Sequence, residues 1–275
     1  MNHNGPEHSQ EMHREHEPGL LTVAAAMRKH DQLQKFGLSW DASNVAFPKL
    51  EEPNLRRSIW RAKRVFAELI HDVTALEGNP FTVPEIQTLL DGITVGGRRI
   101  SDADQVINQK NSFLHLFKLV ESGNFSLGLQ VARDLQGIAA RGEALKEGVF
   151  RDGTVSISGT TYKPPVGEGK ELESLLENGF LRMADASEAL GNTFEKGMAV
   201  FLHVARNQSF WDGNKRTGRL LMNGVLLSAG QDVITIPAIL QVEYHRKMLA
   251  FYESGDGTEM MNFLSKLQIR SKFEP

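Results

Sequence analysis

The sequence predicts a mainly α-helical protein with one short β-hairpin. Apolar residues recur at helical spacing in several segments, among them 107–121, 127–140 and 197–206. By contrast, β-prone residues gather in one stretch, 155–161, around a Ser-Gly pair that is typical of a hairpin turn. No internal repeat is apparent, and the length of 275 residues fits one large domain or two small ones.

The N-terminal part divides into a polar tail and a helical region. Residues 1–18 hold four His and four Glu with almost no apolar side chains, so we expect a disordered tail. Metal binding by its histidines is the less favoured alternative, because their spacing is irregular. Helices are predicted over 20–36 and 58–73, the second with Ser58 as its N-cap, and a further helix start is predicted at 82–85.

The composition narrows the class of protein. Lys and Arg number 31 against 34 Asp and Glu, and a net charge of −3 gives no general affinity for nucleic acid or acidic membranes. With no Cys, disulfides, thiolate chemistry and Cys-based zinc sites are excluded. No apolar stretch approaches the roughly 18 residues that a bilayer span requires. We therefore expect a cytoplasmic protein with neither nucleic-acid nor membrane partners, while a bacterial effector route stays open.

The run Gln208–Arg219 has the composition of an anion site at the start of a helix. A turn-forming triplet is followed by three cations within two helical turns, and an apolar run continues the helix. Free backbone N–H groups, the positive end of the helix dipole and the cations all favour a polyphosphate. Asp212 beside such a site would suit a divalent cation, because hard cations take oxygen ligands from carboxylates and phosphates together. The run therefore predicts a nucleotide and Mg²⁺ site.

The same run resembles the signature of the Fic (Fido-fold) proteins, His-x-Phe-x-(Asp/Glu)-Gly-Asn-(Gly/Lys)-Arg-x-x-Arg. Seven specified positions agree, whereas Gln208 stands where the family has His. The resemblance implies a Fido-fold helical bundle over residues 106–270, preceded by an N-terminal helical region over 19–105. It also implies that Asp212 binds Mg²⁺ and that the nucleotide, ATP, is held by Gly213, Asn214, Lys215, Arg216 and Arg219.

Two further stretches extend the resemblance. The predicted hairpin, with Val155, Ile157 and Thr161, falls where the family has its target-binding flap. Upstream, the Glu-Gly-Asn run that begins at Glu77 is similar to the inhibitory motif (Ser/Thr)-x-x-x-Glu-(Gly/Asn), although Val73 occupies the hydroxyl position.

The inhibitory resemblance implies a contact between Glu77 and Arg219. The Glu77 carboxylate would pair with the Arg219 guanidinium in the space that the γ-phosphate needs. An ordinary role is also open, because Glu-Gly-Asn can end a helix with Gly78 in the left-handed conformation. Both can hold at once.

The residue at position 208 leaves the activity open. The family resembled here includes protein adenylyltransferases, in which the His takes the proton from a target hydroxyl as it attacks the α-phosphate of ATP. A neutral Gln cannot accept that proton, and losing a general base typically costs about 10² to 10⁴ in rate. A Gln can still orient an attacking oxygen. Two functions follow: a slow or degenerate adenylyltransferase acting on an unidentified target protein, or a nucleotide-binding pseudoenzyme with a regulatory, antitoxin-like role.

Two nearby residues bear on these alternatives. His203 lies on the predicted helix before the motif, where a core role is favoured over that of a substitute base. Lys215 replaces the Gly of most adenylyl-transferring members and resembles the Doc branch, in which phosphate is transferred to a protein. A Doc-like protein phosphotransferase is thus a minority enzymatic alternative.

Overall fold

The computed structural model describes Met1 and residues 37–167, 169–185 and 192–269. The predicted tail beyond Met1 and the predicted helix over 20–36 lie outside the described residues. The described helices are η1 (Ala42–Asn44), α2 (Leu55–Arg64), α3 (Phe66–Ala75), α4 (Val83–Leu90), α5 (Ile100–Glu121), α6 (Leu129–Ala139), α7 (Gly169–Asp185), α8 (Thr193–Asn207), α9 (Asn214–Ser228), η3 (Ala238–Leu240), α10 (Gln241–Ser254) and α11 (Thr258–Leu264).

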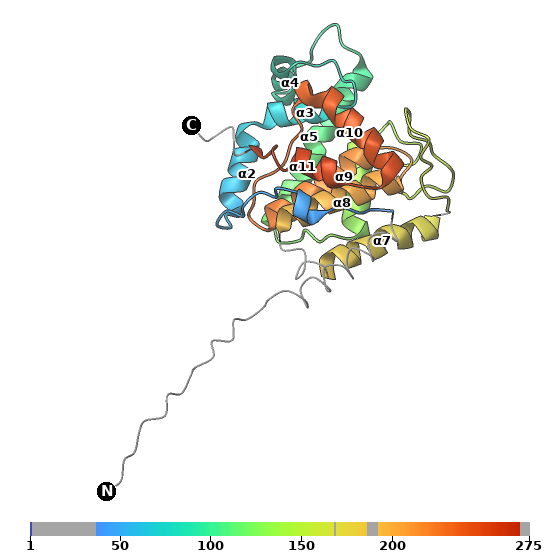
Figure 1. The fold of residues 1–275 in the computed structure, drawn as a ribbon. Coiled ribbons are helices and arrows are strands. Elements are labelled where there is room, and N and C mark those ends of the chain that lie inside the picture. The colour runs from blue at the N-terminus through green and yellow to red at the C-terminus, as the bar shows by residue number, and fades with distance from the viewer. Residues whose placement is uncertain (2–36, 168, 186–191, 270–275) are drawn as a thin grey trace.

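Helices α8 and α9 form the centre of the fold (Figure 1). All residues of α8 from Gly197 to its end are buried, which confirms the buried helix predicted over 197–206. Close packing of the pair depends on Gly218, where an added Cβ would stand 3.0 Å from the carbonyl oxygen of Phe201. The loop between the two helices, which carries the predicted nucleotide site, is therefore mounted on two rigid elements.

Helices α5, α6 and α7 cover this central pair. Helices α5 and α6 pack on each other and on α9, while α7 packs on α8 (Figure 1). The helices predicted over 107–121 and 127–140 are confirmed as parts of α5 and α6, although α5 begins seven residues earlier, at Ile100. The patterns above predict neither α7 nor the pair α10 and α11.

The single helix predicted over 58–73 is wrong, because the chain forms α2 and α3 with a break at Val65. Val65 has φ −111° and ψ 30°, outside the helical region. The N-cap of α2 is Asn54, whose side chain accepts a hydrogen bond from the Arg57 N–H at 2.9 Å. Ser58 lies inside α2, and its hydroxyl donates to the carbonyl of Gly230 at 3.1 Å. Ser58, which the local pattern predicts as an N-cap, therefore makes a tertiary contact instead.

The helix start predicted near residue 82 is confirmed at α4. Thr82 and Glu85 form a capping box, in which the Glu85 carboxylate accepts from the Thr82 N–H at 2.8 Å. Arg98 forms a two-point ion pair with the same carboxylate, at 3.0 and 2.6 Å. These contacts connect the beginning of α4 to the turn before α5.

The predicted β-hairpin is not seen. Residues 151–165 are all described and contain no strand. The expected pairing partners are used elsewhere: the Glu253 carboxylate of α10 accepts hydrogen bonds from the Thr161 N–H at 2.7 Å and from the hydroxyls of Thr160 and Thr161. Pro164 and Pro165 offer no N–H to a ladder. The segment is held by other elements instead of pairing with itself.

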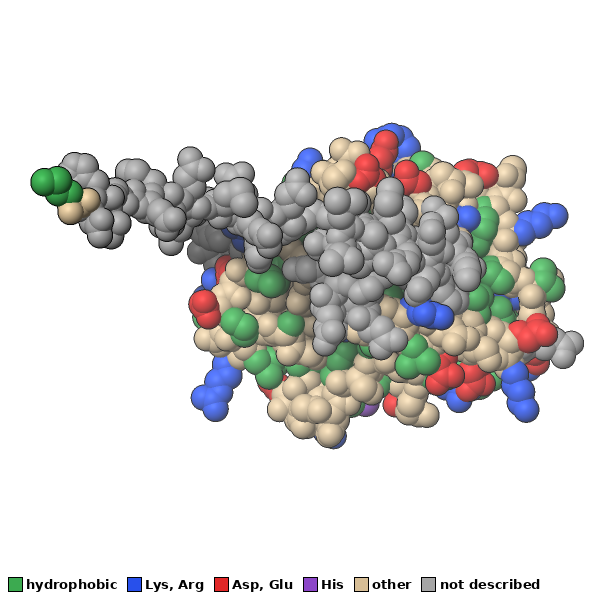
Figure 2. Space-filling view, turned by 60° about the horizontal axis from the view of Figure 1, so that its bottom comes forward, with side chains coloured by type: hydrophobic (Ala, Val, Ile, Leu, Met, Phe, Trp, Pro, Cys, Tyr) green, Lys and Arg blue, Asp and Glu red, His purple; other side chains and the backbone are tan. Residues whose placement is uncertain are grey.

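Charged side chains of both signs are scattered over the visible face of the molecule (Figure 2). This distribution agrees with the nearly balanced composition and its net charge of −3. Among the described residues, none of the helices has the length and apolar character needed to cross a bilayer.

Candidate functional site

The loop between α8 and α9 has a left-handed backbone at the residue where it begins and at the glycine before α9. The chain leaves α8 through Gln208, which has a left-handed backbone with φ 47°, and enters α9 through Gly213 with φ 73°. Asn214 then closes the loop, because its amide accepts from the Phe210 N–H at 2.9 Å and donates to the Phe210 carbonyl at 2.8 Å. The predicted helix start is thereby observed at Asn214.

The loop rests on the end of α6. An added Cβ at Gly213 would stand 2.8 Å from the Cβ of Ala140, so a larger residue would displace one of the two segments. Gln136 donates to the Asp212 carbonyl at 3.0 Å and accepts from the Gly148 N–H at 2.6 Å. One buried amide therefore fixes the motif loop relative to the turn that follows α6.

Phe210, the aromatic residue of the signature, anchors the loop in the core. It is fully buried and stacks on Phe150 with ring centroids 4.9 Å apart. The neighbouring Arg151 is also fully buried and donates to three backbone carbonyls, those of Gln208, Gly153 and Pro165. Arg151 thus connects both ends of the 151–165 segment to the motif, a role that no sequence motif indicates.

The side-chain amide of Gln208 connects the end of α8 to the start of α9. Its Nε2 donates to the Ala205 carbonyl at 2.6 Å, and its Oε1 accepts from the Asn214 side chain at 3.2 Å. A neutral amide in this position can orient a neighbouring group but cannot accept a proton. His203 is fully buried, hydrogen-bonded to Asn207 at 2.9 Å, and burial lowers its pKa to about 4. It is a core residue, as expected.

We call Lys215, Arg216 and Arg219 the cation cluster; all three lie on the first two turns of α9. Arg219 donates to the Glu77 carboxylate at 3.0 Å and to the Tyr244 hydroxyl at 3.0 Å. The Lys215 ammonium lies 3.4 Å from the second oxygen of Glu77. The structure therefore brings Glu77 against two members of the cluster, including the Arg219 contact that the resemblance implies.

The electrostatics of Glu77 follow from this placement. Burial alone would raise the pKa of its carboxyl group, but the charges of the cation cluster outweigh burial and lower the pKa to about 2. The pKa of Arg219 is raised, because its interactions with Tyr244 and Glu77 outweigh its own burial. Both shifts describe the same ion pair, which is charged on both sides at neutral pH.

The turn after α3 presents Glu77 to the cluster. Gly78 has φ 85°, and its N–H donates to the Ala75 carbonyl at 2.9 Å, so the helix-end role and the ion pair hold together. The Thr74 hydroxyl donates to the Ile70 carbonyl at 2.9 Å, within its own helix. It does not anchor α3 to the motif.

Arg216 pairs with Glu143, a residue that sequence reasoning missed. Its two terminal nitrogens lie 2.6 and 3.1 Å from the two carboxylate oxygens, and one of them also donates to the Ala139 carbonyl at 2.8 Å. Glu143 lies 73 positions before Arg216 in the chain, in a turn without a motif. Only the packing of α6 against α9 brings the two together.

Asp212 lies at the edge of the site with its side chain 57% exposed. One of its oxygens accepts from the Gly213 N–H at 2.5 Å and lies 3.7 Å from Arg216. Among the described residues, no group of three or more His, Cys, Asp or Glu side chains could hold a metal ion. An exposed carboxylate next to the cation cluster does fit a Mg²⁺ ion shared with phosphate oxygens.

The predicted flap residues occupy the segment between α6 and α7. Val155 and Ile157 are half-buried, whereas Thr161 is exposed and bound to Glu253. The base of the segment reaches the motif, because the Arg151 N–H donates to the Ser209 carbonyl at 3.0 Å. The segment therefore borders the site without adopting the predicted hairpin.

Residues 127–226 match the family model described as Fic/DOC family. Among curated proteins, the chain is similar to protein adenylyltransferase Fic of Drosophila erecta, at 26% identity over 235 residues, and of Drosophila willistoni, at 27% over 237 residues. Each match covers 82% of this chain but 45% of the relative, so the chain spans about half the length of these proteins.

Solved structures of Fic proteins share the fold. Fic-1 from C. elegans aligns with a TM-score of 0.63 at 17% identity, covering 91% of this chain and 70% of that structure. A Fic domain containing signaling protein from Bacteroides thetaiotaomicron aligns with a TM-score of 0.65 at 18% identity, covering 88% of this chain and 93% of that structure. At these identities the likeness concerns the fold. The chain is thus similar to Fic proteins in residues 127–226 and in the sequence of the curated relatives, and it shares the fold of the solved Fic structures.

Proposed function

We propose that this protein binds Mg-ATP at the cation cluster and transfers AMP to a hydroxyl side chain of a target protein, at a low rate. The observation that carries the proposal is the gathering of three cations and Asn214 at the first turns of α9, beside the exposed carboxylate of Asp212. Backbone N–H groups and cations at a helix start favour phosphates. The names of the Drosophila relatives support adenylyl transfer as the family-level reaction.

The proposed chemistry assigns each group a physical role. A target hydroxyl oxygen would attack the α-phosphorus, the bond to the β-phosphate oxygen would break, and pyrophosphate would leave. Mg²⁺, held by Asp212 and the phosphates, would neutralise charge on the leaving group. The Asn214 side chain and the N–H groups at the start of α9 would hold the α-phosphate. Gln208 would orient the attacking oxygen, and the released proton would pass to solvent.

Glu77 acts as an inhibitory group in this proposal. Its carboxylate accepts from Nη2 of Arg219 at 3.0 Å and lies 3.4 Å from Lys215. A γ-phosphate would need the same donors, and the negative charge of Glu77 would repel it. Nucleotide binding therefore requires Glu77 to move away.

One observation favours a second function, that of a nucleotide-binding regulator without transfer activity. The Gln208 amide is engaged at both ends, by the Ala205 carbonyl at 2.6 Å and by Asn214 at 3.2 Å. An amide so fixed offers no proton acceptor to a target hydroxyl. Both functions share ATP binding, so covalent transfer separates them.

Label transfer tests the proposal. The full chain and its Glu77→Gly variant are incubated with a lysate of the source cell and Mg-ATP labelled at either the α- or the γ-phosphate. We expect α-label on protein, and more of it with Glu77→Gly. Label from the γ-phosphate alone would indicate Doc-like phosphate transfer. ATP binding by calorimetry without any transfer would favour the regulator, and no ATP binding in either protein would overturn the nucleotide site itself.

A further inference from the structure

We infer that Glu143 is a second internal counter-ion of the nucleotide site, which competes with nucleotide phosphates for Arg216. The inference rests on the proposed function. Both terminal nitrogens of Arg216 face the two Glu143 oxygens, at 2.6 and 3.1 Å. This two-point geometry is the one that a guanidinium offers to a phosphate. While Glu143 is in place, a phosphate cannot take the same face of Arg216.

The cation of this pair is fixed, whereas the carboxylate can leave. The Arg216 side chain is 3% exposed, and the Ala139 carbonyl at the end of α6 accepts from its Nη1 at 2.8 Å. That contact does not involve Glu143 and would keep the guanidinium in position. The Glu143 side chain is 29% exposed and belongs to the turn after α6. Rotation of this side chain into solvent would free the fork of Arg216.

The charge of the site also favours competition. The three positive charges of the cation cluster face three carboxylates, those of Glu77, Glu143 and Asp212. With all three in place, the cluster offers an incoming triphosphate no net positive charge at short range. Removal of Glu77 and Glu143 leaves a positive excess, while Asp212 remains for the metal. Each counter-ion therefore lowers the affinity for nucleotide.

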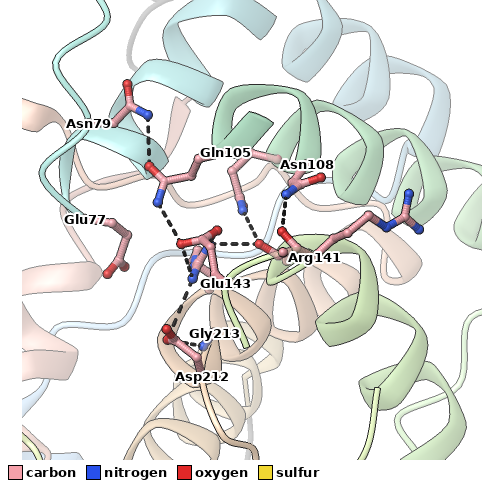
Figure 3. A network of polar contacts seen from close by, with 12 residues as sticks. Glu77, Asn79, Gln105, Asn108, Arg141, Glu143, Asp212 and Gly213 are labelled. Atoms are coloured by element: carbon pink, nitrogen blue, oxygen red, sulfur yellow. Dashed lines mark hydrogen bonds and ion pairs between the residues drawn. The ribbon is translucent and has the colours of Figure 1, made fainter. Parts of the chain in front are cut away.

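Two amide side chains connect Glu143 to the turn that carries Glu77. Gln105 of α5 donates to the Glu143 carboxylate at 3.0 Å and accepts from the Asn79 side chain at 2.9 Å. Asn79 lies two residues after Glu77. Figure 3 shows the side chains of Asn79, Gln105 and Glu143 one after another between the Glu77 turn and Asp212. Displacement of the Glu77 turn would remove a partner from Gln105, and through it weaken the hold on Glu143.

Calorimetric titration with Mg-ATP and with AMP tests this inference. The proteins are Glu77→Gly and the double variant Glu77→Gly with Glu143→Gln, which keeps the side-chain shape but removes the charge. We expect ATP affinity to rise by about tenfold on adding Glu143→Gln, the order expected when a charge-assisted pair becomes neutral. AMP affinity should stay unchanged, because AMP lacks the outer phosphates.

A matched control removes one charge elsewhere. Glu121 at the end of α5 pairs with Lys63 at 3.1 Å, both side chains being 48% exposed, so Glu121→Gln changes the net charge without touching the site. We expect no change in ATP affinity. A similar gain in this control would attribute the effect to overall charge and overturn the inference.

The remaining outcomes are equally decisive. Unchanged or weaker ATP binding with Glu143→Gln would show that Glu143 braces Arg216 instead of competing for it. If that variant does not fold, Gln105→Ala replaces it, since it removes one partner of Glu143 at a half-buried position of α5. Tighter ATP binding supports the inference and unchanged binding overturns it. Failure of Glu77→Gly itself to bind ATP would instead refute the proposed function.

Discussion

The motif loop 208–214 and the segment 151–165 border the same site but obtain their shapes in different ways. The loop is fixed by its own residues, through the left-handed Gln208, Gly213 and the hydrogen bonds between Asn214 and Phe210. The segment depends on contacts with distant residues, because Arg151 at its base donates to the Gln208 carbonyl and Thr161 donates to Glu253 of α10. Local sequence therefore predicts the first well and the second poorly.

The largest expected effect is on the rate of label transfer, and it tests whether the motif loop can support catalysis. Gln208→His supplies a general base at the position where the loop leaves α8, and His is among the residues that tolerate a left-handed backbone. With φ 47° at this position, the substitution should fold without new strain. We expect label transfer from α-labelled ATP to rise by about 10² to 10⁴. An unchanged rate in a variant that still binds ATP would mean that the loop lacks catalytic geometry.

The next effect concerns the residue that shapes the segment. Arg151→Ala would leave three backbone carbonyls without their buried donor. We expect the free energy of unfolding to fall by about 3 kcal/mol, measured by urea denaturation. Arg151→Lys is the matched control, since it keeps the charge but can reach fewer of the carbonyls, and should fall between Ala and the parent protein. A loss below about 1 kcal/mol with Ala would contradict the assigned role.

A smaller effect on ATP affinity is expected from the pairing of Glu77 with Arg219. Glu77→Gly should strengthen ATP binding by about 1.5 to 3 kcal/mol, because a charge-assisted competitor is removed. The same change in an Arg219→Ala background should have much less effect, since the guanidinium for which Glu77 and the γ-phosphate compete is absent. Titration of the four proteins measures the coupling. Additive effects on affinity would remove the inhibitory role of Glu77.

The pH dependence of stability provides a control for the same ion pair. The pKa of Glu77 is lowered from 4.5 to about 2 in the folded protein, so its ionised form is favoured by folding. The stabilisation is complete above pH 4.5 and is lost as the pH falls toward 2. The difference in unfolding free energy between the parent and Glu77→Gln should thus be constant above about pH 5 and shrink below it. A constant difference down to pH 3 would contradict the pair.

The smallest effect concerns the outer end of the segment. The Glu253 carboxylate accepts from Thr160 and Thr161, and these hydrogen bonds lower its pKa, but the group is exposed. Glu253→Ala should speed hydrogen exchange at the Thr161 amide while the melting temperature changes by no more than about 2 °C. Slow exchange after the substitution would mean that the segment is held by something other than Glu253.

The comparison between loop and segment also explains what could be predicted. Buried helices with strong apolar periodicity, such as α8, and the capping box of α4 follow from local patterns, and the structure confirms them. The missing hairpin at 151–165 does not, because its residues bond to distant partners. The break at Val65 does not follow from the apolar spacing of residues 58–73 either. Likewise, Glu143 carries no motif, and its contact with Arg216 arises from the packing of α6 on α9.

By itself, the sequence determined that the chain is mainly helical and that three cations lie together at one helix start. Turn residues, cations and apolar periodicity act within a few positions of one another, so their order alone specifies this local structure. The tertiary structure decided which carboxylates face those cations. Glu77 and Glu143 meet them only after α3, α6 and α9 have packed, since an ion pair between distant residues depends on the three-dimensional path of the chain.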